Sequence, residues 1–140
     1  MRVLCCGGRT YSNREKVYEV LDQINSKTPI TEIHQGGAFG ADRLAAEWAF
    51  ERDISCEEHP ADWKRYGNTA GIFRNIEMFK ASNPHMVIAF PGGAGTNHMI
   101  SVAKRSDNPV EVLEITDESV IVKENDILTL AESIPSNADS

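Results

Sequence analysis

The fold is decided by the stretch Met86-Val87-Ile88-Ala89-Phe90-Pro91-Gly92-Gly93-Ala94-Gly95-Thr96. Its first five residues are apolar and form the strongest strand pattern in the sequence, bounded by prolines on both sides. Three glycines follow, and a helical pattern starts near Thr96. A buried strand, a glycine-rich turn and a helix make up the repeating unit of α/β proteins. The stretch therefore predicts one such unit in a parallel sheet.

The same unit recurs along the chain. The other predicted strands span residues 3–6, 30–34, 54–58 and 110–115. The predicted helices begin at a capping box of Ser12 and Glu15, at Ala41, at about Ala70 and near Thr96. Five strands and four helices in strict alternation predict an α/β fold, a Rossmann-like doubly wound parallel sheet with strand order 3-2-1-4-5 and helices on both faces.

Three of the helices have an apolar side that we expect to pack on the sheet. In the helix that follows the capping box this side consists of Val17, Val20, Leu21 and Ile24. In the helix over residues 41–52 this side consists of Leu44, Ala45, Trp48 and Ala49. In the helix from Ala70 it consists of Ile72, Ile76 and Phe79.

The sequence after Thr116 departs from this alternation. Residues 120–122 and 127–130 predict either a hairpin or a strand followed by a short helix, and residues 136–140 are polar and expected to be disordered. We therefore expect one domain over residues 1–116 and a C-terminal β extension over residues 117–140.

Composition excludes several classes of protein. The net charge of −7 argues against a general nucleic-acid surface, which needs a basic face. No apolar run approaches the roughly 20 residues that span a bilayer, and the N-terminus lacks the pattern of a signal peptide. We expect a cytoplasmic protein without membrane contact, in which the three cysteines (Cys5, Cys6 and Cys56) are reduced and buried as small apolar residues.

Three strand ends are rich in glycine, and these loops predict the ligand site. They are Gly7-Gly8-Arg9, the run from Gly36 to Arg43, and the run from Pro91 to Thr96. In α/β sheets, ligands bind outside the carboxyl ends of the strands. Glycine lets the backbone approach a phosphate, and the N-terminus of the following helix attracts the anion; Thr96 is expected to cap its helix or to donate a hydroxyl group to the ligand. One such loop alone is as well explained as a tight turn, but three at one sheet edge favour a phosphate-bearing ligand.

The spacing of these glycines is neither that of a GK[ST] phosphate loop nor a complete GxGxxG fingerprint, which argues against ATP hydrolysis and simple dehydrogenase chemistry. Arg9, Arg43 and Arg74 are candidates for bidentate contacts to phosphate. His34 and His98 have neither a clear acidic partner nor the spacing of metal ligands, so no metal and no cofactor is expected. The loop aromatics Phe39, Trp63 and Tyr66 are candidates for packing against a base or ribose.

In combination, these motifs resemble the SLOG superfamily, specifically its YspA-like, cpYpsA-related branch of small bacterial and phage proteins. The resemblance rests on Leu4–Tyr11, His34–Ala45, Pro60–Trp63, Arg74-Asn75 and Ala89–Thr96, so it spans residues 1 to about 115. It implies a Rossmann-like fold with a nucleotide-type ligand over the strand ends. The wider superfamily includes cytokinin-activating phosphoribohydrolases and sensors of nicotinamide- or ADP-ribose-derived signals.

The chain departs from the hydrolases of that superfamily at one position. They pair an arginine, matched here by Arg74, with the glutamate of PGGxGTxxE, where this chain has Met99. A thioether can neither orient water nor stabilise an oxocarbenium-like centre. His98 is adjacent but points about 100° away on a helix, and Asp42 and Asp62 remain alternative carboxylates.

Three hypotheses follow. The favoured one is a module that senses or sequesters a nucleotide or an ADP-ribose-like molecule, with a homo-oligomer left open. The second is an N-glycosidase or phosphoribohydrolase that releases base from nucleoside monophosphates, with Arg74, Asp42 and His98 as candidate catalytic residues. The third, a DNA-processing accessory protein, is disfavoured by the charge. The predicted ligand-binding residues are Gly7, Gly8, Arg9, Gly36, Gly37, Gly40, Ala41, Asp42, Arg43, Arg74, Pro91, Gly92, Gly93, Gly95 and Thr96.

Overall fold

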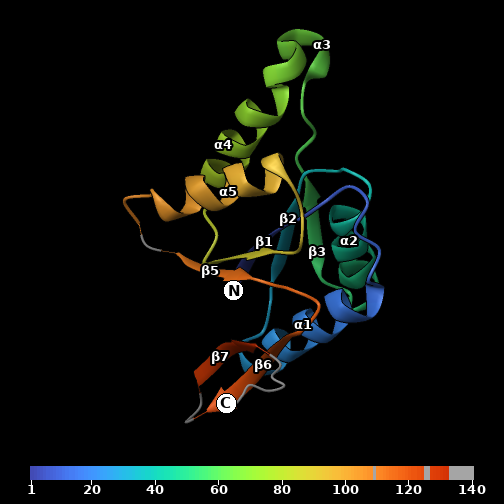
Figure 1. Cartoon of the computed structure of the whole chain (residues 1–140), viewed down its shortest axis with the longest axis vertical. Coiled ribbons are helices and arrows are strands. Elements are labelled where there is room, and N and C mark those ends of the chain that lie inside the picture. Colours follow the sequence, from blue (N-terminus) through green and yellow to red (C-terminus); the bar gives the residue numbers. More distant parts are fainter. Residues whose placement is uncertain (109, 125–126, 133–140) are drawn as a thin grey trace.

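The structure, a computed structural model, describes residues 1–108, 110–124 and 127–132, with side chains up to residue 118 (Figure 1). The expectation that residues 136–140 are disordered lies outside the described residues. Among the described helices, none is long and apolar enough to cross a membrane.

A five-stranded, all-parallel sheet forms the centre of the molecule. Its strands are β1 (Arg2–Cys6), β2 (Glu32–Gln35), β3 (Ser55–Glu58), β4 (Met86–Ala89) and β5 (Glu111–Glu114). Their order is β3-β2-β1-β4-β5, which confirms the predicted topology. Strand β1 lies at the centre, where Val3 pairs with Ile33 of β2 on one side and with Met86 of β4 on the other.

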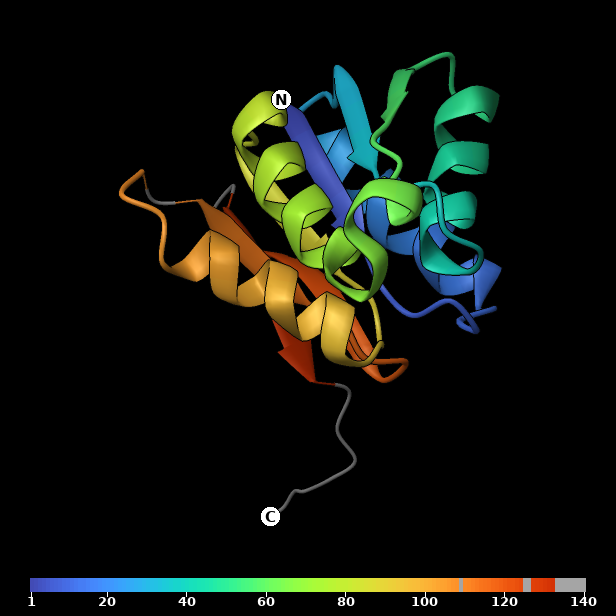
Figure 2. The ribbon, with the colours of Figure 1, turned by 90° about the horizontal axis from the view of Figure 1, so that it is seen from above.

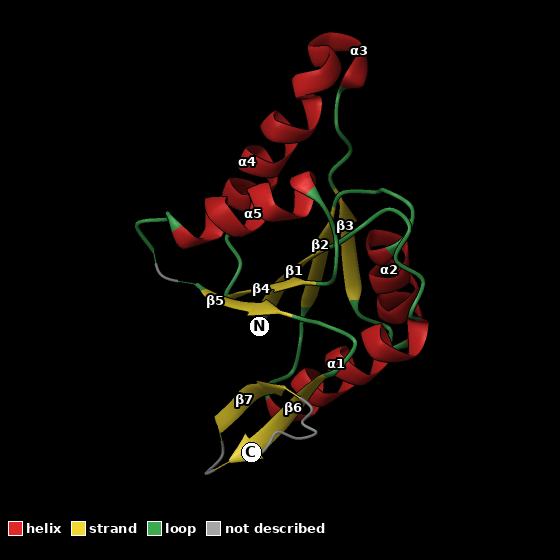
Figure 3. Ribbon diagram, viewed as in Figure 1, coloured by secondary structure: helices red, strands yellow, loops and turns green. Residues whose placement is uncertain are grey.

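Helices cover both faces of the sheet, as predicted (Figure 2 and Figure 3). Helices α1 (Arg14–Lys27) and α2 (Ala41–Glu51) cover one face, and α4 (Ala70–Ser82) and α5 (Ala94–Lys104) cover the other. Residues of β1 alternate between the two cores: Val3 and Cys5 pack with α1 and α2, and Leu4 and Cys6 pack with α4 and α5. The predicted inner side of α2 is confirmed, because Ala45, Trp48 and Ala49 are buried and Leu44 packs at their edge.

The start of α1 differs from the predicted capping box. Asn13, not Ser12, is the N-cap, and its Oδ1 accepts the N–H of Lys16 at 3.1 Å. An asparagine caps a helix as well as a serine does. With Asn13 in that place, the helix starts one residue later than the Ser12–Glu15 pattern predicts.

The connection between β3 and α4 is more helical than expected. It contains the short helix α3 (Trp63–Tyr66) and a 3₁₀ turn over Gly67–Thr69. Both extend beyond the sheet together with the first turn of α4 (Figure 1). The predicted apolar stripe of α4 is wrong at Ile72, which is 48% exposed, because the buried side of the helix consists of Ala70, Asn75, Met78 and Ser82.

The position of each strand in the sheet decides whether its cysteines are buried or exposed. Cys5 and Cys6 are buried in the central strand, and burial raises the pKa of the Cys6 thiol to about 12. Cys56 is exposed, contrary to expectation, because β3 is the edge strand and all four of its residues are exposed.

The C-terminal segment forms a hairpin, one of the two predicted alternatives. Strand β6 (Ser119–Glu124) pairs antiparallel with β7 (Ile127–Glu132) as a separate two-stranded sheet. The hairpin follows β5 and lies next to α1 (Figure 1). The division into a domain over residues 1–116 and an extension stays a prediction.

Candidate functional site

The loops after β1 and β4 border a cavity of about 630 Å³ at the carboxyl edge of the sheet. Strands β1 and β4 are neighbours, and from β1 the chain proceeds to β2 on the opposite side. The cavity therefore lies at the topological switch point, where open α/β sheets bind their ligands. Its lining consists of Gly8, Arg9, Thr10, Tyr11, Ser12, Asn13, Pro91, Gly92, Gly93 and Asp117.

Several predicted glycines allow the loops to pack on one another. The N–H of Gly8 donates to the carbonyl of Pro91 at 2.8 Å, and the N–H of Ala41 donates to the carbonyl of Gly8 at 3.2 Å. A Cβ at Gly7 would lie 2.5 Å from the Cβ of Ala41, and a Cβ at Gly40 would overlap the carbonyl of Gly8. Gly40 also has a φ of +81°. These glycines and Ala41 thus join the three loops, and only Gly8 among them lines the cavity.

Gly93 and Gly95 differ from the others, because a Cβ at either position would meet no atom within 4 Å. Gly93 is the N-cap of α5, and it has no side chain that caps the helix. The helix starts at Ala94, two residues before the expected start near Thr96. Thr96 is therefore a buried residue of the first turn, and the prediction that it caps the helix is wrong.

Arg74 and Asp42 lie around Gly36, at the end of β2. Arg74 Nη1 donates to the carbonyls of Gly36 at 2.7 Å and His59 at 3.3 Å. Asp42 Oδ2 accepts the N–H of Ala38 at 3.1 Å. Burial raises the pKa of Asp42 above its ordinary value and lowers the pKa of Arg74, each partly offset by the other's charge. Neither residue lines the 630 Å³ cavity; both support the loop after β2.

Gly37, also predicted, has a φ of +81°, and a Cβ there would lie 2.7 Å from the carboxylate of Glu58 at the end of β3. Its N–H donates to Gln35 Oε1 at 2.6 Å. Gly37 is thus part of the turn itself and does not line the cavity.

Asn75 connects α4 to the glycine-rich loop, a role that the sequence analysis did not assign. Its side chain is buried, and Nδ2 donates to the carbonyl of Gly95 at 3.2 Å and lies 3.1 Å from His98 Nδ1. Arg74 Nε donates to Asn75 Oδ1 at 3.0 Å. The sequence offered one indication of this role, because Asn75 is a polar residue on the buried side of an amphipathic helix.

The two remaining arginines are in different surroundings. Arg9 is exposed and lines the cavity. Arg43 lies on α2, where its guanidinium stacks on the exposed ring of Phe39 at 4.5 Å from the centroid. It borders a second hollow of about 460 Å³ with Phe50 and Glu51, away from the lining of the first.

Tyr11 and Asp117 form a side of the cavity that the sequence analysis missed. Tyr11 Oη donates to Asp117 Oδ1 at 2.8 Å, and Asn13 Nδ2 donates to the same oxygen at 3.2 Å. Burial raises the pKa of the Tyr11 phenol, and the hydrogen bond to Asp117 raises it further. Asp117 was expected to lie in the extension, and no motif marks it. The predicted aromatics Phe39, Trp63 and Tyr66 do not line the cavity.

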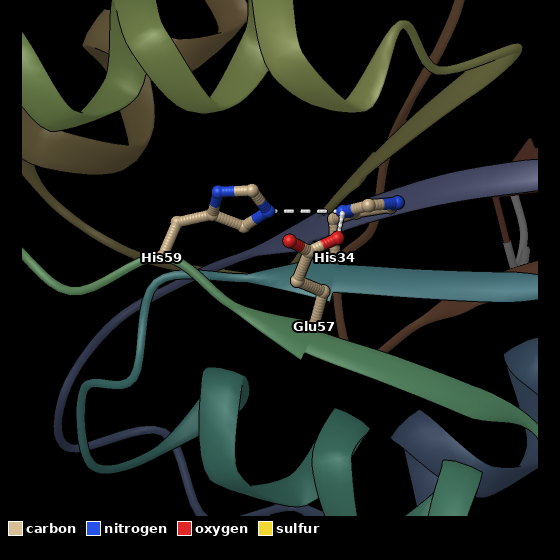
Figure 4. Close-up of side chains that lie close together, drawn as sticks. All are labelled: His34, Glu57 and His59. Carbon is tan, nitrogen blue, oxygen red and sulfur yellow. Dashed lines mark hydrogen bonds and ion pairs between the residues drawn. The ribbon is translucent and has the colours of Figure 1, made fainter.

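His34 has the acidic and imidazole partners that the sequence analysis did not find. Its Nε2 lies 2.8 Å from Glu32 Oε1, and its Nδ1 lies 2.9 Å from His59 Nε2 and 3.6 Å from Glu57 Oε1 (Figure 4). The side chains come from β2, from β3 and from the residue that follows β3. Among the described residues, these three (His34, Glu57 and His59) are the group that can hold a metal ion.

Comparison with known proteins places these features in a family. The model of the YspA, cpYpsA-related SLOG family matches residues 1–66, which contain the first two glycine-rich loops. The Gene 61 protein of Mycobacterium phage D29 is 36% identical to this chain over 118 residues, which cover 78% of this chain and 93% of the phage protein. Both findings agree with the motif-based expectation, and they are consistent with a nucleotide-related ligand.

Proposed function

This chain belongs to the YspA, cpYpsA-related SLOG family, and we propose that it binds a nucleotide or an ADP-ribose-like derivative in the cavity between the β1 and β4 loops. In this proposal the protein senses or sequesters the ligand and leaves it intact. The single observation that supports it most is the open backbone at Gly93 and Gly95, at the start of an eleven-residue helix beside that cavity.

A phosphate group fits the start of α5 for two reasons. The first N–H groups of a helix have no partner within the helix, and the helix dipole attracts an anion. Glycine without neighbouring atoms allows the phosphate oxygens to approach the backbone closely. Arg9, which also lines the cavity, supplies a cation for a charge-assisted contact.

The rest of the cavity suits the remainder of a nucleotide. Its volume of about 630 Å³ lies within the roughly 300–1,000 Å³ that is common for small-molecule sites. Tyr11 offers an aromatic face, and the Asp117 carboxylate offers acceptors for ribose hydroxyls. We assign these two residues to the sugar end of the ligand and α5 to the phosphate end.

Hydrolysis is the second candidate, and the chain offers little for it at the cavity. Met99, in place of the hydrolase glutamate, is fully buried in the core beneath α5. Asp42 is a buried carboxyl with a raised pKa, which is a property of general acids, but it is bonded to the Ala38 backbone and does not line the cavity. Binding without turnover is the simpler proposal.

The test is calorimetric titration of the purified full chain with AMP, ADP and ADP-ribose, with adenosine as the control without phosphate. We expect saturable binding of at least one phosphate ligand and weaker binding of adenosine. Chromatography of the mixture after prolonged incubation should show intact nucleotide. Release of free base would replace the proposal by the hydrolase, and no binding of any of these ligands would refute it.

Gly93→Ala is the informative variant, because its Cβ would enter open space and need not disturb the fold. It should weaken the binding of the phosphate ligand while the circular dichroism spectrum stays unchanged. Gly71→Ala in α4 is the matched control, since Gly71 is a helical glycine outside the cavity lining. Equal binding by wild type and Gly93→Ala would remove α5 from the phosphate site.

A further inference from the structure

We propose that His34, Glu57 and His59 bind a divalent transition-metal ion, with Zn²⁺ as the best match. The site lies on the β2–β3 side of the sheet and does not depend on the nucleotide proposal. The register of the sheet assembles it, because His34 pairs directly with Glu57 and His59 follows two residues later on the same face. Figure 4 shows the three side chains converging from the two adjacent strands.

The distances suit one small ion. All three ligand atoms lie within 4.8 Å of one another. His34 Nδ1 is 2.9 Å from His59 Nε2 and 3.6 Å from Glu57 Oε1. In a tetrahedral site with bonds of roughly 2.1 Å, neighbouring ligand atoms are about 3.4 Å apart. The two separations from His34 Nδ1 lie on either side of this value, and the separation between His59 and Glu57 is at most 4.8 Å, so a modest inward movement of the exposed Glu57 side chain would complete the geometry.

Glu32 contacts the ring nitrogen of His34 that does not face the site. Its Oε1 lies 2.8 Å from His34 Nε2, which places the proton of the neutral ring on Nε2 and leaves the Nδ1 lone pair directed at the site. A metal-bound histidine almost always donates its other N–H in this way, often to a carboxylate. His34 is only 3% exposed, so its ring is also held by packing.

His59 is held by its backbone as well. Its N–H donates to the carbonyl of Gln35 at 2.8 Å, and its own carbonyl accepts from Arg74 Nη1 at 3.3 Å. Two imidazoles and one carboxylate are a common set for zinc, with a fourth position left for water. The Glu57 side chain is 67% exposed, which leaves that position open to solvent.

The same contacts also occur in a simple hydrogen-bond network, in which His59 Nε2–H donates to His34 Nδ1. The two interpretations differ in one measurable respect: only a metal site takes up an ion with one-to-one stoichiometry. A bound ion would also join the ends of β2 and β3, and so raise the midpoint of thermal unfolding.

The experiment is titration of metal-free, tag-free full-length protein with Zn²⁺ by calorimetry and with Co²⁺ by visible absorption. Both are done in a Cys56→Ser background, because the exposed Cys56 thiol is a strong zinc ligand that neighbours Glu57 in the sequence and lies on the opposite face of β3. We expect one ion per chain, the intense visible bands of tetrahedral Co²⁺, and a zinc-edge X-ray absorption spectrum with nitrogen and oxygen ligands only.

The variants separate the ligands from their surroundings. His59→Gln and Glu57→Gln are chosen because neither residue is buried, and each should weaken Zn²⁺ binding more than the 10- to 100-fold that is typical of an outer partner. Glu32→Gln should weaken it within that range. Glu58→Gln, on the opposite face, is the matched control and should bind as wild type.

Three results would overturn the proposal: no saturable Zn²⁺ binding, loss of binding on Cys56→Ser alone, or unchanged affinity in both His59→Gln and Glu57→Gln. Circular dichroism shows whether His59→Gln and Glu57→Gln are folded. If one of them is misfolded, the zinc affinity of the other tests the proposal.

Discussion

Two polar regions lie near the carboxyl ends of the strands, and they are built in different ways. The cavity at β1 and β4 is lined mainly by two continuous loops, residues 8–13 and 91–93. The cluster at β2 and β3 consists of side chains from Glu32, His34, Glu57 and His59, which strand pairing brings together. The first type of site leaves a contiguous motif in the sequence. The second leaves only isolated residues.

The largest expected effect separates two glycines within the loop region. Gly40→Ala should lower the free energy of unfolding by about 3 kcal/mol or more, because a Cβ at φ +81° is strained and would overlap the Gly8 carbonyl. Gly93→Ala should change it by less than about 0.5 kcal/mol. Urea denaturation of both variants measures the difference. Equal losses of stability would mean that Gly93 is as tightly packed as Gly40, and that its backbone is not open to a ligand.

The next comparison is between the two exposed arginines of the predicted site. Arg9→Ala should weaken the binding of a phosphate ligand roughly 10- to 100-fold, which corresponds to losing a charge-assisted hydrogen bond of about 1.5–3 kcal/mol. Arg43→Ala should leave affinity unchanged, because Arg43 stacks on Phe39 outside the cavity lining. Calorimetric titration of both variants tests this. A loss on Arg43→Ala would extend the site along α2.

Asn75 tests how the loop region is supported. Asn75→Ala should lower the free energy of unfolding by about 1–2 kcal/mol, since it removes the hydrogen bond to the Gly95 carbonyl and leaves buried groups without their partner. Chemical denaturation gives the stability, and the ligand titration of the same variant shows whether the loop has moved. A neutral substitution would mean that α5 is held by its apolar contacts alone.

The smallest effect concerns the histidine–carboxylate cluster in metal-free protein. The pKa of His59 is lowered in the folded chain, so the unfolded chain binds more protons as the pH falls through the ordinary range of histidine. Stability should therefore fall between about pH 7.5 and 5.5, and less steeply in His59→Gln. Thermal unfolding at several pH values measures both slopes. Parallel slopes would show that folding does not lower the pKa of His59.

Much of the fold was predictable because its determinants are local. Most strands and helices follow from a local apolar pattern, and strict alternation leaves few topologies for a parallel sheet. The errors concern which side of a helix or strand is covered by a neighbouring element, and the sequence does not reveal this. Ile72 was assigned to the core by its helical spacing, but α4 buries the side that carries Asn75, Met78 and Ser82. Cys56 was assigned to the core although β3 is an edge strand.

The candidate site was predictable to a similar degree. The glycine-rich loops do meet at one edge, but Arg74 and Asp42 support the loop after β2, whereas Asp117 reaches the cavity from beyond the expected domain boundary. Sequence spacing shows which strand end a residue follows. It does not show toward which neighbour the side chain turns, since that depends on packing.

By itself, the sequence determined the α/β alternation, the strand order, the family and two of the loops that border the cavity, because each of these depends on a continuous stretch of residues. Only the tertiary structure decided that Gly93 and Gly95 are open while Gly7 and Gly40 are packed, and that Glu32, His34, Glu57 and His59 lie on one face. The two Glu-x-His segments, 32–34 and 57–59, were visible in the sequence. Their meaning depends on a parallel register that pairs His34 with Glu57, and register is a property of the folded sheet.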